Sequence, residues 1–276
     1  YDEMGLVGSA TGAGHDVYHS TRNLRLACDD TLSYYDEAYI SDFAYFDHIV
    51  PTGALDAMAT VALARKPRWL HSVKGTSSRN GTTDHTITYP PTTAGSLQVA
   101  FLYGSDNVPL TMQTVGWTQR LIQPSSTDGA LYIYTRSVNA GETSCTISYA
   151  TAGFPLNYAI YELPPGSSYH SLASISHAQA GLLPTLSGLP GTPVLVFGIV
   201  SAVETNAGNS VTSSIFRYGW LGEMDNFIAH DGVTNGSYLA VGYQDYLSTT
   251  SATPNVQVYN TMANSHEEAT IAFVVP

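Results

Sequence analysis

The stretch Ser96–Pro164 decides the fold of this chain. It contains a Gly116-Trp117 pair and four short segments: SLQVAFLYG (96–104), ALYIYTRSV (130–138), TSCTISY (143–149) and LNYAIYEL (156–163). The segments are rich in β-branched and aromatic residues and are bounded by Gly, Pro, Asn or Ser, as strands of an antiparallel sheet are. Alternation along the first segment places Leu97, Val99, Phe101 and Tyr103 on one face.

The same order of segments recurs later in the chain. PVLVFGIVSAV (193–203), the pair Gly219-Trp220 and SYLAVGY (237–243) follow one another, and residues 255–259 and 269–275 complete the series. Trp117 and Tyr132 are 15 residues apart, and Trp220 and Leu239 are 19 apart. We therefore predict a duplication, with repeats at residues 92–164 and 186–276. The alternative is a chance likeness, because every all-β chain repeats its strand and turn residues.

These patterns predict an all-β protein, an antiparallel β-sandwich of jelly-roll type built from two similar four-strand units. We expect it to span residues 66–276, with one buried face per sheet and two sheets facing each other. The final AFVV is apolar on both faces, which predicts a central strand. Residues 167–180 are expected to connect the two repeats.

Composition excludes several classes of protein. Only 12 % of the residues are charged, too few for a protein of long helices, and 43 % are hydrophobic, too many for a disordered chain. The net charge of −12 argues against nucleic acid as a partner. No apolar run approaches the roughly 20 residues of a membrane span, and the first residues lack the features of a secretory signal. We predict no membrane insertion.

Residues 1–65 differ from the rest of the chain. Ten acidic residues face only Arg22 and Arg25 before Arg65, so this segment carries about two-thirds of the net charge. It is also rich in aromatic residues, which favours an irregular arm that packs on its own sandwich or on a neighbouring subunit. The alternative is a mobile acidic tail. GALDAMATVALA (53–64) favours one short helix. The candidate assembly contacts are Tyr34, Tyr35, Tyr39, Phe43, Tyr45 and Phe46.

No residue pattern predicts catalysis, a metal site or a cofactor. The nine histidines form only fragments of a ligand set, and carboxylates such as Glu142 and Glu162 lie in no glycosidase motif. A catalytic triad that contains Ser and is assembled from distant loops stays an open alternative. Trp117 and Trp220 are interpreted as core plugs of the two repeats, the alternative being that exposed Trp rings stack on a sugar.

The two cysteines leave two alternatives. Cys28 and Cys145 are the only cysteines of the chain, and a single disulfide between them stays open. We favour a free Cys145 that packs as a small apolar residue.

Residues 67–276 resemble a β-sandwich of minor tail and other structural proteins of tailed bacteriophages; similar modules occur in bacterial surface proteins. The resemblance is carried by PTTAGSLQVA (91–100), Gly116-Trp117, ALYIYTRSVNAGETSCTISY (130–149) and NYAIYELPP (157–165). It implies a scaffold without catalytic residues. The Lys-poor composition, rich in Ala, Thr and Gly, fits a phage of a high-GC, actinobacterial host.

The resemblance implies a non-enzymatic virion protein, expected at the tail tip or baseplate and assembled in the host cytoplasm. The partners expected are other virion proteins, copies of the chain itself and, if the protein serves host attachment, a glycan of the host cell surface. Alternatives are a capsid decoration or head-fibre protein, a glycan-binding receptor-recognition module and an enzyme that acts on envelope polysaccharide.

Overall fold

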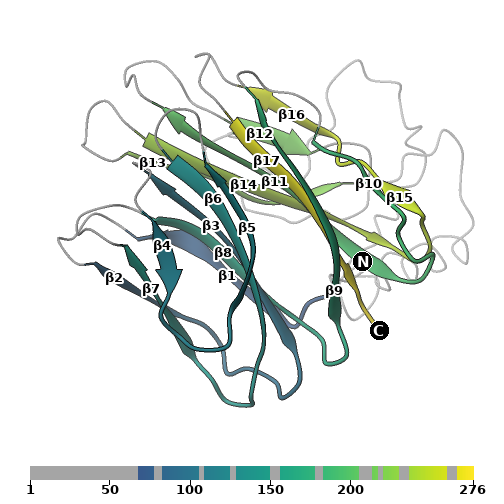
Figure 1. Ribbon diagram of the computed structural model, residues 1–276, viewed down its shortest axis with the longest axis horizontal. Helices are drawn as coiled ribbons and strands as arrows, with labels where there is room; N and C mark the ends of the chain where they lie inside the picture. The colour runs from purple at the N-terminus through teal and green to yellow at the C-terminus, as the bar shows by residue number, and fades with distance from the viewer. Residues whose placement is uncertain are drawn as a thin grey trace, which may run out of the picture. The chain divides into compact units, whose positions relative to one another are not determined.

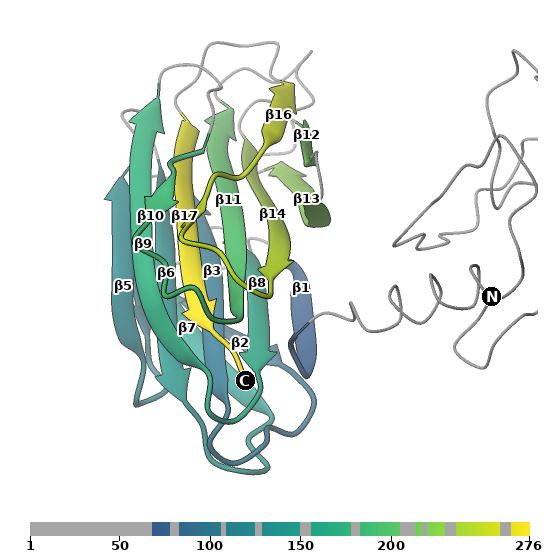
Figure 2. The same cartoon turned by 90° about the vertical axis from the view of Figure 1, so that its right-hand side faces the viewer.

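Two five-stranded antiparallel sheets face each other through the main core, and smaller sheets cover their outer faces (Figures 1 and 2). The computed structural model describes residues 68–77, 83–105, 109–124, 129–149, 156–177, 183–204, 213–216, 220–229, 236–259 and 266–276. The arm predicted at 1–65, its six candidate contacts, Cys28 and the helix predicted at 53–64 lie outside these ranges.

The expected fold class is confirmed, because every regular element in the described ranges is a strand and all the pairings are antiparallel. The first nine strands are β1 (His71–Ser77), β2 (Asp84–Thr88), β3 (Leu97–Ser105), β4 (Leu110–Met112), β5 (Thr118–Pro124), β6 (Gly129–Ser137), β7 (Ser144–Tyr149), β8 (Leu156–Leu163) and β9 (Ser168–His177). The others are β10 (Leu186–Ser187), β11 (Val194–Glu204), β12 (Ser213–Phe216), β13 (Leu221–Ala229), β14 (Gly236–Tyr246), β15 (Ser251–Ala252), β16 (Val256–Tyr259) and β17 (His266–Val274).

The two large sheets have the same topology. Their strand orders are β1-β8-β3-β6-β5 and, read in the equivalent direction, β9-β17-β11-β14-β13. Each strand of the first sheet therefore has a counterpart in the second sheet. The counterparts occupy equivalent positions in the two sheets and follow one another in the same order along the chain. The outer sheets agree as well. β7 pairs with β2 and β4, and its counterpart is split into β15, which pairs with β10, and β16, which pairs with β12.

A bulge at matching positions supports the duplication. The pairing register shifts at Arg120 in β5 and at Glu223 in β13, in each case at the third residue after the Trp of a Gly-Trp pair. With the bulges superposed, Tyr132 is equivalent to Ala240, one position beyond the Leu239 that spacing alone suggested. The physical reason is side-chain direction, because Tyr132 faces the outer layer whereas Leu239 faces the main core.

Three expectations about the strands are wrong. Each unit has more than four strands, because β1 and β9 complete the five-stranded sheets and lie before residues 92 and 186. Ser168–His177 does not connect the repeats but is β9, which pairs with β17. The central sheets also bury both faces rather than one. All of β6 except Ser137 is buried, because one face meets the second large sheet and the other meets the layer of β2, β7 and β4. The expected central position of the AFVV strand is confirmed, since β17 lies between β11 and β9.

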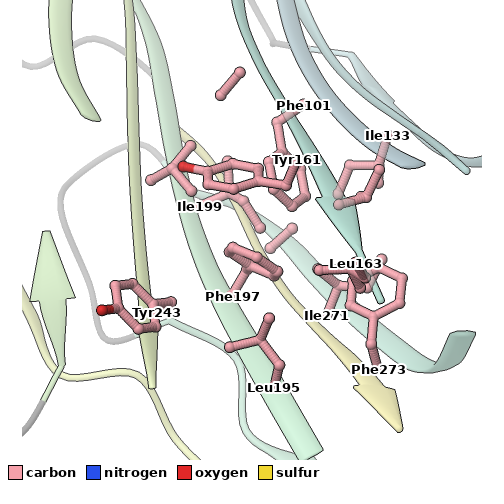
Figure 3. Packing of buried hydrophobic residues seen from close by; sticks show 14 of the residues in the cluster. Phe101, Ile133, Tyr161, Leu163, Leu195, Phe197, Ile199, Tyr243, Ile271 and Phe273 are labelled. Atoms are coloured by element: carbon pink, nitrogen blue, oxygen red, sulfur yellow. The ribbon is translucent and has the colours of Figure 1, made fainter. Parts of the chain in front are cut away.

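The main core is a layer of rings and aliphatic side chains between the two large sheets (Figure 3). Phe197 of β11 lies at its middle, with ring centroids 4.8 Å from Tyr161, 5.2 Å from Phe101 and 6.1 Å from both Trp69 and Phe273. Such tilted and edge-on contacts are the arrangements that aromatic pairs prefer. Strands from both repeats supply these rings, so neither large sheet completes this core alone.

The repeats pack on each other reciprocally. β5 lies against β9 on one side of the core, and β1 lies against β13 on the other. Because β13 is the counterpart of β5 and β9 is the counterpart of β1, the two contacts are equivalent, and β3 lies on its own counterpart β11. This is the contact pattern of an isologous dimer. The described part of the chain therefore resembles a symmetric dimer joined into one polypeptide.

Replacing Phe197 with Ala should test the joint core. We expect Phe197→Ala to lower the free energy of unfolding by about 3–5 kcal/mol, because the vacated space lies where both sheets meet. Chemical denaturation of the full chain measures the change. Val115→Ala is the control, since Val115 is 87 % exposed and its loss should change stability by less than about 0.5 kcal/mol. Equal stabilities of the two variants would contradict the joint core.

Candidate functional site

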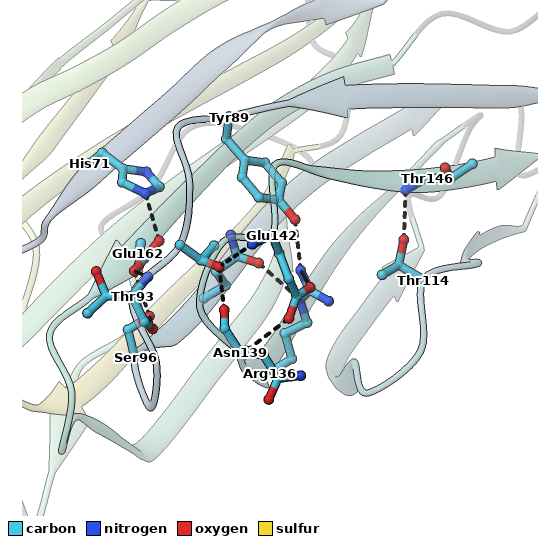
Figure 4. Close-up of polar contacts among 12 residues, drawn as sticks. His71, Tyr89, Thr93, Ser96, Thr114, Arg136, Asn139, Glu142, Thr146 and Glu162 are labelled. Carbon is cyan, nitrogen blue, oxygen red and sulfur yellow. Dashed lines mark hydrogen bonds and ion pairs between the residues drawn. The ribbon is translucent and has the colours of Figure 1, made fainter.

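Arg136 of β6 holds the turn between β6 and β7. Its guanidinium donates to Glu142 Oε2 at 2.8 Å, to Gln98 Oε1 at 2.9 Å and to the Tyr89 hydroxyl at 2.7 Å (Figure 4). The guanidinium carbon also lies 4.9 Å from the ring centre of Trp117. Arg136 is only 5 % exposed, so these partners replace the water that a charged group requires.

The same turn is tied to the loop that precedes β3. Glu142 Oε1 accepts a hydrogen bond from the backbone amide of Asn139 at 2.9 Å, and the Thr92 hydroxyl donates to the backbone carbonyl of Asn139 at 2.5 Å. The backbones of Thr92 and Glu142 are joined at 3.0 Å. Gly141 has a φ of +80°, a conformation that favours glycine at this point of the turn. Residues 139–144 thus form a turn that the Arg136–Glu142 ion pair holds against β6. We call this arrangement the clamp.

Glu162 of β8 ties the start of β1 and the loop before β3 to the sheet. The Thr93 amide donates to its Oε1 at 2.8 Å and the Ser96 hydroxyl donates to the same oxygen at 2.6 Å (Figure 4). His71 Nε2 lies 2.6 Å from Oε2. Glu162 is fully buried, so its carboxylate is engaged by protein groups and has no access to a dissolved substrate.

The two Gly-Trp pairs place their indoles against the outer layers. Trp117 is partly buried and packs against the cluster between β2, β7, β4 and the first large sheet. Trp220 is 5 % exposed, lies in the corresponding cluster of the second repeat and has its ring centroid 6.4 Å from that of Tyr246. Neither ring stands on the surface as an exposed stacking platform.

The second repeat does not repeat the polar groups of the first. By the strand registers, Gln98, Arg136 and Glu162 correspond to Val196, Gln244 and Ala272. Two of these three replacements are apolar and lie in a buried cluster. The networks of Arg136 and Glu162 are therefore features of the first repeat.

Burial keeps several titratable groups neutral. It raises the pKa of the Cys145 thiol to about 11, although Arg136 opposes the shift, and it raises the pKa of Tyr134 to about 12. Cys145 is a free thiol, 1 % exposed, and packs in the apolar cluster under the outer sheet of the first repeat. The interpretation of Cys145 as a small apolar core residue is confirmed.

Asp245 and His170 have other partners. Burial raises the pKa of Asp245, although its partner Arg68, 2.8 Å away, opposes the shift. His170 Nδ1 makes a 2.8 Å contact with the neighbouring Ser171 hydroxyl. In the described ranges, no group of three or more His, Cys, Asp or Glu side chains is close enough to hold a metal ion. No helix within those ranges is long and apolar enough to cross a membrane.

An open hollow lies over the outer sheet of the first repeat. Its volume is about 520 Å³, and its lining residues are Thr83, Asp84, Gln113, Thr114, Thr146, Ser148 and Tyr149. The outward-facing positions of β2 and β7 are Asp, Thr and Ser, whereas His85, Ile87, Cys145 and Ile147 face the core. The sequence alone did not reveal this site, because its residues come from three separate stretches of the chain.

Family models, curated proteins and solved structures were all compared with this chain, and none matches it.

Removing Glu142 should test the clamp. We expect Glu142→Ala to lower the free energy of unfolding by about 2–3 kcal/mol, because it leaves the buried Arg136 guanidinium without its carboxylate. Thr143→Ala in the same turn is the control, since Thr143 is exposed and should change stability by less than about 0.5 kcal/mol. Denaturant titration measures both. A Glu142→Ala protein as stable as its control would rule out the clamp.

Thiol labelling should test the burial of Cys145. In the folded full-length protein at pH 8, iodoacetamide should leave the Cys145 peptide unmodified, because the thiol is enclosed and stays protonated at that pH. The same peptide should be alkylated fully after denaturation, as peptide mass spectrometry would show. Rapid alkylation of Cys145 in the folded protein would disprove this description.

Proposed function

We propose that this chain is a non-enzymatic structural protein of a tailed-phage virion, a minor tail protein at the tail tip or baseplate that contributes to assembly and to host attachment. The observation that carries the proposal is the role of the residues behind the family resemblance. Trp117 and Glu142 contact the buried guanidinium of Arg136, and this contact fastens a turn to the sheet. Glu162, the carboxylate of the Tyr-Glu-Leu motif, fastens the loop before β3 to β8. The resemblance thus rests on framework residues, as expected for a scaffold.

The duplicated architecture suits such a role. Rings from both repeats form the main core, so the sandwich is a rigid body that can carry load and present loops. The arm at residues 1–65 would supply the docking element, because its aromatic residues are of the kind enriched at protein interfaces. A capsid decoration or head fibre would use the same rigid body at another place in the particle.

A glycan-binding module is the second candidate function. It is favoured by one observation, the polar hollow over β2, β7 and β4, which offers hydroxyl, amide and carboxylate groups on a rigid sheet. This role is compatible with a place in the tail.

Deleting residues 1–60 should separate folding from assembly. We expect the shortened chain to remain folded and soluble, with the circular dichroism of a β protein, because the core described here uses only residues from 69 onward. It should no longer be incorporated into particles when it replaces the full chain during phage growth. The Val115→Ala full-length protein is the control and should be incorporated normally. Normal incorporation of the shortened chain would overturn the role of the arm.

A further inference from the structure

We propose that the hollow over β2, β7 and β4 binds a neutral saccharide through its hydroxyl groups. The proposal deepens the host-attachment part of the proposed function and rests on it only for its biological meaning. The hollow is open to solvent and large enough for one or two sugar rings, at about 520 Å³. It lies on the face of the outer sheet that points away from the core.

The chemistry of the lining favours a polyhydroxyl ligand. Four of the seven lining residues that the structure describes are Thr or Ser, and Gln113 adds an amide and Asp84 a carboxylate. Hydroxyls and amides both donate and accept hydrogen bonds, as sugar hydroxyls do. Tyr149 is the only aromatic residue of the described lining and is 2 % exposed, and more of the exposed lining surface is polar than apolar.

Charge selects a neutral ligand over an anionic one. Among the described lining residues, Asp84 is the one that carries a charge. A carboxylate at this place disfavours phosphorylated, sulfated or uronic-acid sugars. A sugar hydroxyl, in contrast, can donate to the Asp84 carboxylate without a change in charge.

The polar groups of the hollow are held in place before any ligand binds. The Ser148 hydroxyl donates to Asp84 Oδ1, and the Thr146 amide donates to Thr114 Oγ1 at 3.0 Å (Figure 4). The hydroxyls of Thr86 and Thr146 meet across the two strands at 3.5 Å. The backbone amide of Gln113 donates to the Thr146 carbonyl at 2.9 Å, which fixes the position of the Gln113 backbone. Such preorganisation lowers the entropic cost of binding.

The second repeat shows that the fold does not require this surface. There the counterpart of β7 is interrupted between β15 and β16 by Thr253, Pro254 and Asn255. Pro254 lies so close to β11 that a Cβ on Gly198 would come within 2.9 Å of it. One repeat therefore completes its sandwich with a broken outer strand, and the other keeps a continuous strand with a row of hydroxyls. The difference lies in the outer layer, whereas the central sheets keep the same topology.

Binding at this site should be weak for a single copy. A shallow hollow without an exposed aromatic ring buries little of a sugar, so we expect a dissociation constant in the millimolar range. Several copies in one particle would raise the effective affinity by avidity.

Solution NMR of the full-length protein should test the site. The probes are maltotriose, mannotriose and the trimer of N-acetylglucosamine, with trigalacturonate as the anionic control. We expect at least one neutral trisaccharide to shift the amide signals of residues 83–84, 113–114 and 146–149 in a saturable way. Trigalacturonate should produce no saturable shift.

Two variants locate the binding. Gln113→Ala should weaken the binding of that trisaccharide by about five-fold, the loss of roughly one hydrogen bond. Thr185→Ala, which removes an exposed hydroxyl near the outer strands of the second repeat, should leave the affinity unchanged. The proposal is overturned if none of the neutral trisaccharides shifts these signals at 20 mM, roughly the top of the expected range, or if Gln113→Ala binds as tightly as the parent. Particle incorporation does not enter this test, so its failure leaves the assembly role standing.

Discussion

The inner strands of each large sheet are buried on both faces, and this burial constrains the rest of the structure. Each sheet shares the main core with its counterpart and is covered on its outer side by its own smaller strands. A charged group on either face must therefore find protein partners, because water does not reach it. The Arg136 clamp and the enclosed Glu162 are consequences of this constraint. Side chains meet solvent on the outer sheets and on edge strands such as β5.

Much of the fold could be predicted from the sequence because its signals are local. Alternation in Leu97–Tyr103, the Gly-Trp pairs and the apolar AFVV strand indicated strands, a duplication and a central position for β17. The second buried face was missed because its residues, such as Gln98, Tyr132 and Tyr134, look amphipathic. β9 was missed because SYHSLASISH lacks a strong apolar face and lies among turn residues.

The candidate site could not be predicted in the same way. Asp84, Gln113 and Ser148 meet only because β2 and β4 both pair with β7, a long-range pairing that no local pattern contains. The clamp could be predicted only in part, because Arg136 and Glu142 both belong to the sequence motif that carries the family resemblance. Their contact with Trp117 appeared only in the structure. The sequence motifs thus indicated residues that hold the fold together, whereas the hollow results from the pairing of β2 and β4 with β7.

We propose that the sandwich serves as a structural part of a virion, and electron cryomicroscopy of the proposed phage particle tests that role. We expect density at the tail tip or baseplate into which the two facing five-stranded sheets fit, with the outer sheet of β2, β7 and β4 toward solvent. A complete reconstruction with every density assigned to other chains, together with the absence of this chain from purified particles by mass spectrometry, would contradict it.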